Sequence, residues 1–162
     1  MKFIDSNVFV YAADSKNPAK RSIARKLIST AVLSGGCRIN VQVLNEFSSV
    51  AHRKLGLTVD EIKAYLEMFR ALPVLPMAAD VTEKGLDVMK RYGLQFYDSL
   101  LLVSASENGC DEFISEDLND GQVYCGMKAV NPAYEDNETH YPIIHPRLSR
   151  DLAFHFAVGL PF

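Results

Sequence analysis

The sequence lacks the features that mark several common classes of protein. It has no apolar run long enough to span a bilayer, and its net charge of −3 is not the basic excess of a protein that binds nucleic acid through charge alone. Its three cysteines are an odd count without C-x-x-C or metal-ligand spacing. The segment Met-Lys-Phe-Ile-Asp places a carboxylate at position 5, where a signal peptide would be apolar. We therefore expect a cytoplasmic protein, not bound to a membrane, with reduced thiols.

Glycine-rich phosphate loops are missing as well. Neither G-x-x-x-x-G-K-[ST] nor G-x-G-x-x-G occurs, so chemistry with a nucleotide cofactor has no phosphate cradle. Each cysteine stands where a small apolar residue would, which favours burial over nucleophilic catalysis. The four histidines have no ligand spacing, which favours surface or structural roles over metal binding.

What the sequence does contain is an ordinary globular composition. Its 162 residues, 48% hydrophobic and 23% charged, fit one domain with a normal core. Residues 1–132 alternate short apolar strands with amphipathic helices, which predicts an α/β domain with a parallel sheet. Residues 133–162 are acidic and turn-rich, then proline-bounded, then apolar, and hold no single period. We interpret them as a C-terminal extension of unknown conformation, whose apolar end should bury against its own subunit or a dimer mate.

Five strands are predicted, at residues 3–4, 39–41, 74–75, 113–114 and 127–130. The predicted helices are one ending at Gly35, one through Glu46, and three over about 58–70, 79–92 and 97–108. Thr58 and Glu61 form a capping box, because each side chain can satisfy a free backbone N–H of the other.

Four carboxylates fall where the carboxyl ends of these strands should lie. Asp5 directly follows the first strand, and Asp117 follows the fourth by three residues. Glu46 lies early in the helix after the second strand, and Asp98 begins the helix that leads into the fourth. Ligands of open parallel sheets bind outside the carboxyl ends of the strands, so we expect these acids to lie together. Asp120 is a further candidate on the loop of Asp117.

Such a cluster favours a hard divalent cation. Crowded carboxylates repel one another, which should raise some of their pKa values. Mg²⁺ prefers oxygen ligands, keeps several waters and needs few carboxylates. The resulting site can activate water and stabilise the in-line displacement of a phosphodiester. No His or Cys accompanies these positions, which argues against zinc.

Each acid also has a simpler interpretation when it is taken alone. Asp98 suits a helix cap, Asp117 suits a turn, and a helix Glu such as Glu46 is usually solvated. Asn7 suits the turn after a strand equally well. The joint placement of the four acids is what favours a site.

The motifs around these acids resemble the PIN-domain family, and within it the VapC toxin nucleases of bacterial toxin–antitoxin pairs. They are FIDSN around Asp5, NEF around Glu46, FYDSL around Asp98, and FISEDLNDG around Asp117 with AVNP at 129–132. The resemblance implies a PIN-like three-layer α/β/α fold with a central parallel sheet of order 3-2-1-4-5. It further implies Mg²⁺- or Mn²⁺-dependent endonucleolytic cleavage of RNA, a homodimer, and inhibition by a small antitoxin. VapC-like toxins end soon after the Asn-Pro, whereas this chain continues for another thirty residues.

The resemblance also assigns roles. Asp5, Asp98 and Asp117 would bind the metal, and Glu46 would complete the shell or position the attacking water. Asn7 and Ser115 would hold the carboxylates by hydrogen bonds, and Asp120 would serve a second ion.

A partner and a dimer surface follow from the same resemblance. An antitoxin would insert a cationic side chain into the acidic pocket. The homodimer would use the helix over 58–70 and its neighbour, with Tyr65 and Phe69 as anchors or, alternatively, as core residues.

Other interpretations remain open. A haloacid-dehalogenase-type phosphotransferase requires Asp-x-Asp after its first strand. Here the second position is Asn7, which cannot act as a general acid. A receiver domain wants paired N-terminal acids, and only Asp5 fits, although Lys128 stands near the last strand. A PIN-like module could instead bind RNA or a protein without cutting, or process RNA as housekeeping. The basic residues before and along the first predicted helix fit RNA phosphates and a solvated face equally well. They are Lys16, Lys20, Arg21, Arg25 and Lys26.

Overall fold

The structure, a computed structural model, describes residues 1–132, in which six strands form one sheet of order β3-β2-β1-β4-β6-β5. The strands are β1 (Lys2–Ile4), β2 (Cys37–Asn40), β3 (Val74–Leu75), β4 (Glu112–Ile114), β5 (Val123–Tyr124) and β6 (Met127–Val130). All pairings are parallel except that of β5 with β6, which is antiparallel. The predicted order is confirmed for the five parallel strands, with β6 as the predicted fifth strand.

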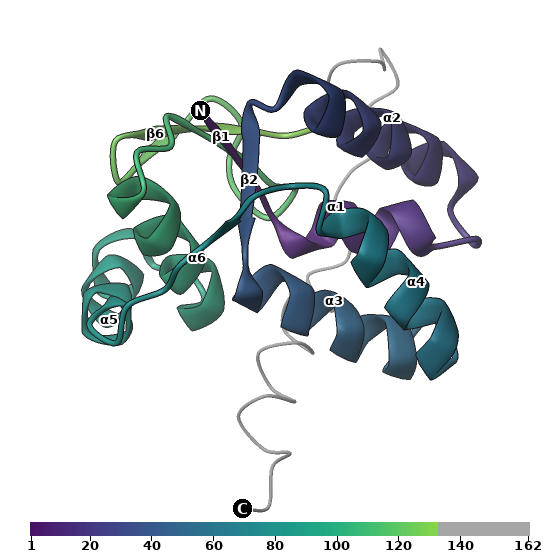
Figure 1. The fold of residues 1–162 in the computed structure, drawn as a ribbon. Helices are drawn as coiled ribbons and strands as arrows, with labels where there is room; N and C mark the ends of the chain where they lie inside the picture. The colour runs from purple at the N-terminus through teal and green to yellow at the C-terminus, as the bar shows by residue number, and fades with distance from the viewer. Residues whose placement is uncertain (133–162) are drawn as a thin grey trace, which may run out of the picture.

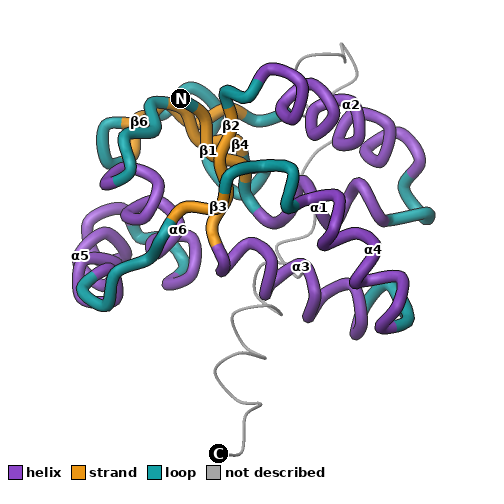
Figure 2. The backbone as a smooth tube through the Cα atoms, viewed as in Figure 1, coloured by secondary structure: helices purple, strands orange, loops and turns teal. Residues whose placement is uncertain are grey.

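Helices flank this sheet on both sides. They are α1 (Ser6–Ala13), α2 (Pro18–Ser34), α3 (Val41–Arg53), α4 (Val59–Phe69), α5 (Val81–Tyr92) and α6 (Phe96–Glu107). In Figure 1 the α5–α6 pair lies on one side of β2, and α2, α3 and α4 lie on the other. Figure 2 shows the strands gathered between these two groups. The expected α/β/α layering is therefore confirmed.

Local signals set several element boundaries as predicted. Thr58 and Glu61 make both bonds of the capping box that begins α4. Gly35 and Gly93 end α2 and α5 in the left-handed conformation, with φ of 65° and 69°, which glycine adopts without strain. These signals are local, so the sequence alone was enough to place them.

Three features differ from the prediction. Helix α1 was not expected, because all of its residues except Asn7 are buried and no polar face gives it a helical period. Strand β2 ends at Asn40, whose side chain accepts the Val43 N–H at 3.1 Å and so begins α3 at Val41. Strand β5 adds an antiparallel edge, reached through a tight turn in which Cys125 and Gly126 have φ of 52° and 83°.

The largest fully buried side chains of the core are aromatic. The rings of Phe3 and Phe113 stack at 5.2 Å on neighbouring strands. Phe69 packs edge-on against Phe9 and Phe47, with ring centroids 4.5 and 4.8 Å apart, and is 2% exposed. Phe69 is therefore a core residue and not an interface anchor, because its ring is enclosed by α1 and α3. Tyr65, which packs beside it, is partly exposed.

Two expectations about the whole chain can be followed in residues 1–132. No helix there is long and apolar enough to cross a membrane. Cys37, Cys110 and Cys125 are all free thiols. The predicted extension over residues 133–162, and the burial expected for its apolar end, lie outside the described residues.

Candidate active site

Asp5 lies at the end of the central strand and caps the helix that follows. Its backbone N–H donates to the Ile114 carbonyl at 3.0 Å, which continues the β1–β4 ladder. Its Oδ1 accepts the Ser6 N–H at 2.6 Å, and its Oδ2 accepts the Ser115 hydroxyl at 2.7 Å. The side chain is 2% exposed. Two strands and a helix therefore fix this carboxylate below the surface.

Asn7 links Asp5 to the loop after β4. Its Nδ2 is within 3.2 Å of Asp5 Oδ2, and within 3.0 Å of both Ser115 Oγ and Asp117 Oδ2. Ser115 Oγ also accepts the Asp117 N–H at 3.0 Å, which positions the loop. The structure thus brings together Asp5, Asn7, Ser115 and Asp117, as the sequence predicted. Asn7 belongs to the first turn of α1 and not to a turn between elements.

Glu46 reaches the same place from α3. Its Oε2 accepts the Ser6 hydroxyl at 2.6 Å, and its Oε1 accepts Gln42 Nε2 at 2.9 Å. Ser6 Oγ also lies 3.2 Å from Asp5 Oδ1, so one hydroxyl bridges two acids. Glu46 is buried, which excludes the solvated interpretation. Sequence reasoning missed Ser6, whose only signal was its position between Asp5 and Asn7.

Asp98 lies in the first turn of α6 and is partly exposed. The N-cap of that helix is Gln95, so Asp98 is not the capping residue. Burial and then the charges of Asp5, Asp117 and Glu46 raise the pKa of Asp98 well above its usual value. Asp98 therefore belongs to the same electrostatic cluster.

The other three acids of the cluster are shifted in the same direction. Burial, followed by the charges of Asp117 and Glu46, raises the pKa of Asp5 to about 7. Burial also raises the pKa of Glu46, against the hydrogen bonds from Ser6 and Gln42. Asp117 is exposed on one side. Burial of the rest of its side chain raises its pKa, whereas the hydrogen bond from Asn7 and the charge of Lys20 lower it. The predicted mutual repulsion is present.

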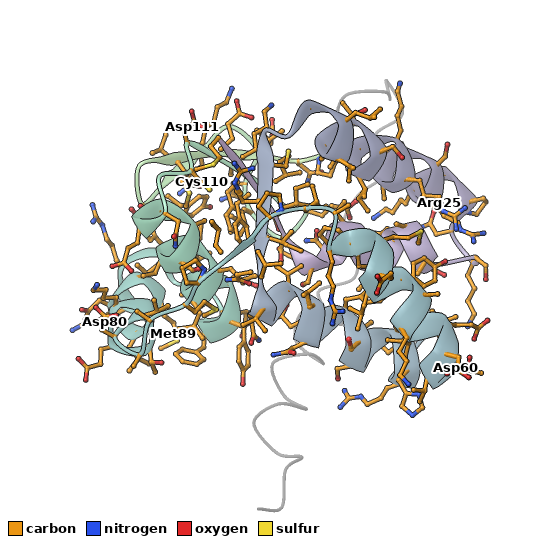
Figure 3. The ribbon with its side chains drawn as sticks, in the orientation of Figure 1. Arg25, Asp60, Asp80, Met89, Cys110 and Asp111 are labelled. Atoms are coloured by element: carbon orange, nitrogen blue, oxygen red, sulfur yellow. The ribbon has the colours of Figure 1, made fainter. Side chains whose placement is uncertain are left out.

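Two acids at the periphery have pKa values shifted in the opposite direction. Asp80 and Asp111 lie at the periphery in Figure 3. Lys84 holds the pKa of Asp80 below its usual value, and the N-terminal ammonium does the same for Asp111. The acids of the cluster differ because burial raises their pKa values, and for Asp5, Glu46 and Asp98 the charge of a neighbouring acid adds to the effect.

The donor set fits a hard cation by its chemistry. It consists of carboxylate oxygens without His or Cys, and the buried Asn7 Oδ1 has no hydrogen-bond partner within residues 1–132. Within the same residues no three His, Cys, Asp or Glu side chains converge as a ready metal cage. Mg²⁺ does not require one, because it keeps several of its own waters.

Two further acids lie on the loop of Asp117. Asp120 is exposed, and its Oδ1 accepts the Asn131 N–H at 2.9 Å, which ties the loop to the end of β6. Its role toward a second ion stays a prediction. Glu116 pairs with Lys20 at 2.7 Å from Oε2 to Nζ. Sequence reasoning missed Glu116, because nothing in the pattern distinguished it from a solvated loop acid.

Comparison with known families decides what kind of domain carries this cluster. The PIN domain model matches residues 2–120. The chain belongs to the PIN domain family. The match spans the four acids, so the resemblance seen in the motifs is confirmed at the level of the family.

Solved structures share this PIN fold at low sequence identity. One is VapC20 of Mycobacterium tuberculosis, described as a sarcin-ricin loop cleaving toxin. It is 16% identical, with a TM-score of 0.57 over 70% of this chain and 87% of that one. Another is VapBC2 of Rickettsia felis, bound to a DNA fragment from their promoter. It is 17% identical, with a TM-score of 0.57 over 80% of this chain and 97% of that one. No curated protein matches the sequence.

Proposed function

We propose that this PIN domain is a Mg²⁺- or Mn²⁺-dependent endoribonuclease that acts as the toxin of a toxin–antitoxin pair in the cytoplasm. The observation that carries the proposal is the cluster of Asp5, Glu46, Asp98 and Asp117, each with a raised pKa, at the carboxyl end of a mostly parallel sheet. Acids whose pKa values are raised by burial and by one another ionise less readily, and a bound cation would offset this effect. Such a cluster is therefore expected where a cation binds.

The four acids would have two different roles. Asp5, Asp98 and Asp117 would hold the cation, directly or through water. When bound, the cation supplies positive charge that activates water and stabilises the in-line displacement. Glu46, whose pKa is raised by burial, would orient the attacking water and accept its proton. The water oxygen bonds to phosphorus as the bond from phosphorus to the leaving oxygen breaks.

Asn7, Ser6 and Ser115 would hold this arrangement in place. Asn7 and Ser115 orient Asp5 and Asp117, and Ser6 joins Asp5 to Glu46 through one hydroxyl. Carboxylates fixed in this way need little rearrangement when the cation binds, which favours a preorganised site.

The proposed partner is a small antitoxin. The similarity to the VapBC2 structure, a toxin with its antitoxin, supports this idea at the level of the fold. An Arg from that partner would pair with the carboxylates as a bidentate fork. A homodimer through α4 would use Tyr65 and not Phe69, since only Tyr65 is partly exposed.

The direct test is cleavage of single-stranded RNA by the purified full-length chain, with Mg²⁺ and with excess EDTA. Asp98→Asn should reduce the rate at least a hundredfold while the protein stays folded, because removal of one carboxylate weakens cation binding. The matched control is Asp87→Asn, an exposed acid on α5, which should cut at the wild-type rate. Equal cleavage in EDTA contradicts the metal mechanism. Wild-type protein that binds RNA but never cuts it supports a non-catalytic PIN module instead.

A further inference from the structure

The basic residues of the first part of the chain have different surroundings in the structure. Arg25 is tied to its own scaffold, since its Nε donates to the Ala12 carbonyl at 2.9 Å and its Nη2 to the Tyr65 hydroxyl at 3.4 Å. Lys16 and Lys26 are exposed. Lys20 instead reaches across to the loop of Asp117, where its Nζ donates to Glu116 Oε2 at 2.7 Å.

The ammonium of Lys20 is held from several sides. Its Nζ lies 4.3 Å from the centroid of the Tyr11 ring, in a cation–π contact from α1. The side chain of Glu116 is 6% exposed and that of Lys20 is 19% exposed. A long, flexible lysine is thereby fixed in one place while part of it still meets solvent.

That place borders the acidic cluster. Glu116 is the neighbour of Asp117 in sequence, and the positive charge of Lys20 acts on Asp117. A lysine ammonium has three donor hydrogens, and Glu116 accepts only one of them. A negatively charged backbone that enters this site meets many carboxylates, so a fixed cation at the edge would offset part of their repulsion.

We propose that Lys20 binds a backbone phosphate of the RNA at the edge of the active site, and that Glu116 and Tyr11 hold its ammonium in position. This inference rests on the proposed nuclease function and adds a substrate-binding residue to it. The competing explanation is that Lys20 only neutralises a buried Glu116, since a buried carboxylate without a partner is unfavourable.

The experiment measures binding of a fluorescent single-stranded RNA oligonucleotide of mixed sequence in Mg²⁺. Asp98→Asn serves as the parent protein so that the RNA stays intact. Lys20→Gln should weaken binding about tenfold, the effect of one lost hydrogen bond to a charged group. It should also reduce the slope of log K against log salt by about 0.7, the value for one phosphate contact on a single strand. Lys20→Arg should stay within about threefold of the parent, because the charge is retained.

Two matched variants separate the explanations. Lys26→Gln removes the same charge from an exposed position on the same helix, and should leave the salt slope unchanged. Glu116→Gln removes the acid that Lys20 neutralises. In that background Lys20→Gln should still weaken binding, but by less than tenfold, because Glu116 no longer holds the ammonium in position. The double variant removes the buried pair as a unit, which favours retention of the fold.

The outcomes are distinct. An effect of Lys20→Gln that vanishes in the Glu116→Gln background, or that Lys26→Gln reproduces, overturns the inference. If wild-type protein still cuts RNA in a parallel assay, the proposed function survives that result. If the parent binds no RNA and the wild type cuts none, both are overturned.

Discussion

Removal of the charge at Asp5 should stabilise the metal-free protein at high pH and destabilise it at low pH. The folded pKa of Asp5 is about 7 against an ordinary 3.8, so between these values the folded state holds a proton that the unfolded state has lost. Stability therefore falls as pH rises through that window, and the full penalty remains above pH 7. A difference of 7 − 3.8, or about 3 pH units at 1.36 kcal/mol each, gives a penalty of at most about 4 kcal/mol.

Asp5→Asn removes this penalty but also loses hydrogen bonds. Oδ1 and Oδ2 both accept bonds, from Ser6 and from Ser115 and Asn7, and an amide nitrogen cannot replace either oxygen as an acceptor. That loss costs about 1–3 kcal/mol at every pH. The net effect is a gain of about 1–3 kcal/mol at pH 8 and a loss of similar size at pH 4, where Asp5 is protonated in the folded wild type.

Thermal unfolding followed by circular dichroism, in EDTA from pH 4 to 8.5, measures this crossover. For a domain of this size, each kcal/mol moves the Tm by roughly 2–4 °C. Saturating Mg²⁺ should make the wild type the more stable protein again at pH 8, since a cation at a hundred times its Kd adds about 2.7 kcal/mol to the free energy of unfolding. Asp87→Asn is the control and should follow the wild type at each pH. A difference between Asp5→Asn and wild type that does not change with pH would refute the reasoning.

The remaining predictions concern the scaffold. Gly85→Ala should lower the Tm by up to about 8 °C, because a Cβ there would lie 2.5 Å from Leu100 Cδ2 and the resulting overpacking, about 1–3 kcal/mol, is offset by only about 1 kcal/mol of helix propensity. Thr58→Ala should cost about 1 kcal/mol in urea unfolding through loss of the capping box, while Mn²⁺ binding measured by calorimetry stays unchanged. Phe69→Ala should cost about 3–5 kcal/mol in the same urea assay, yet leave the sedimentation coefficient of the folded protein unaltered, because the ring lies in the core.

The sequence predicted those parts of the fold that rest on local chemistry. Strand β1 is an apolar pair closed by an acid, α4 begins with a capping box, and α5 ends at a glycine. Helix α1 was not predicted because it is buried on nearly every side and so lacks the polar face by which a helix is recognised in a sequence. Strand β5 was not predicted because the turn that pairs it with β6 is Cys125-Gly126, which is not one of the usual hairpin signals such as Asn-Gly or Asp-Gly.

The same distinction between local signals and long-range packing applies to the site. The strand ends predicted that Asp5 and Asp117 would meet, since β1 and β4 are neighbours in a parallel sheet. The bridge from Ser6 to Glu46 and the pair of Lys20 with Glu116 join residues 40 and 96 positions apart. Such pairs depend on how helices pack on the sheet, and one sequence shows no pattern for them.

The order of the strands also has a consequence for biosynthesis. Strand β1 leaves the ribosome first, yet β4, its neighbour in the sheet, is made near the end of the described chain. The bond from Asn7 to Asp117 spans 110 positions, which at roughly 5–20 residues per second is a delay of about 5–20 s. During that interval Asp5 exists without the loop that completes its surroundings. If the site cuts RNA as proposed, the growing chain cannot complete its active site, or cut its own message, before residue 117 has left the ribosome.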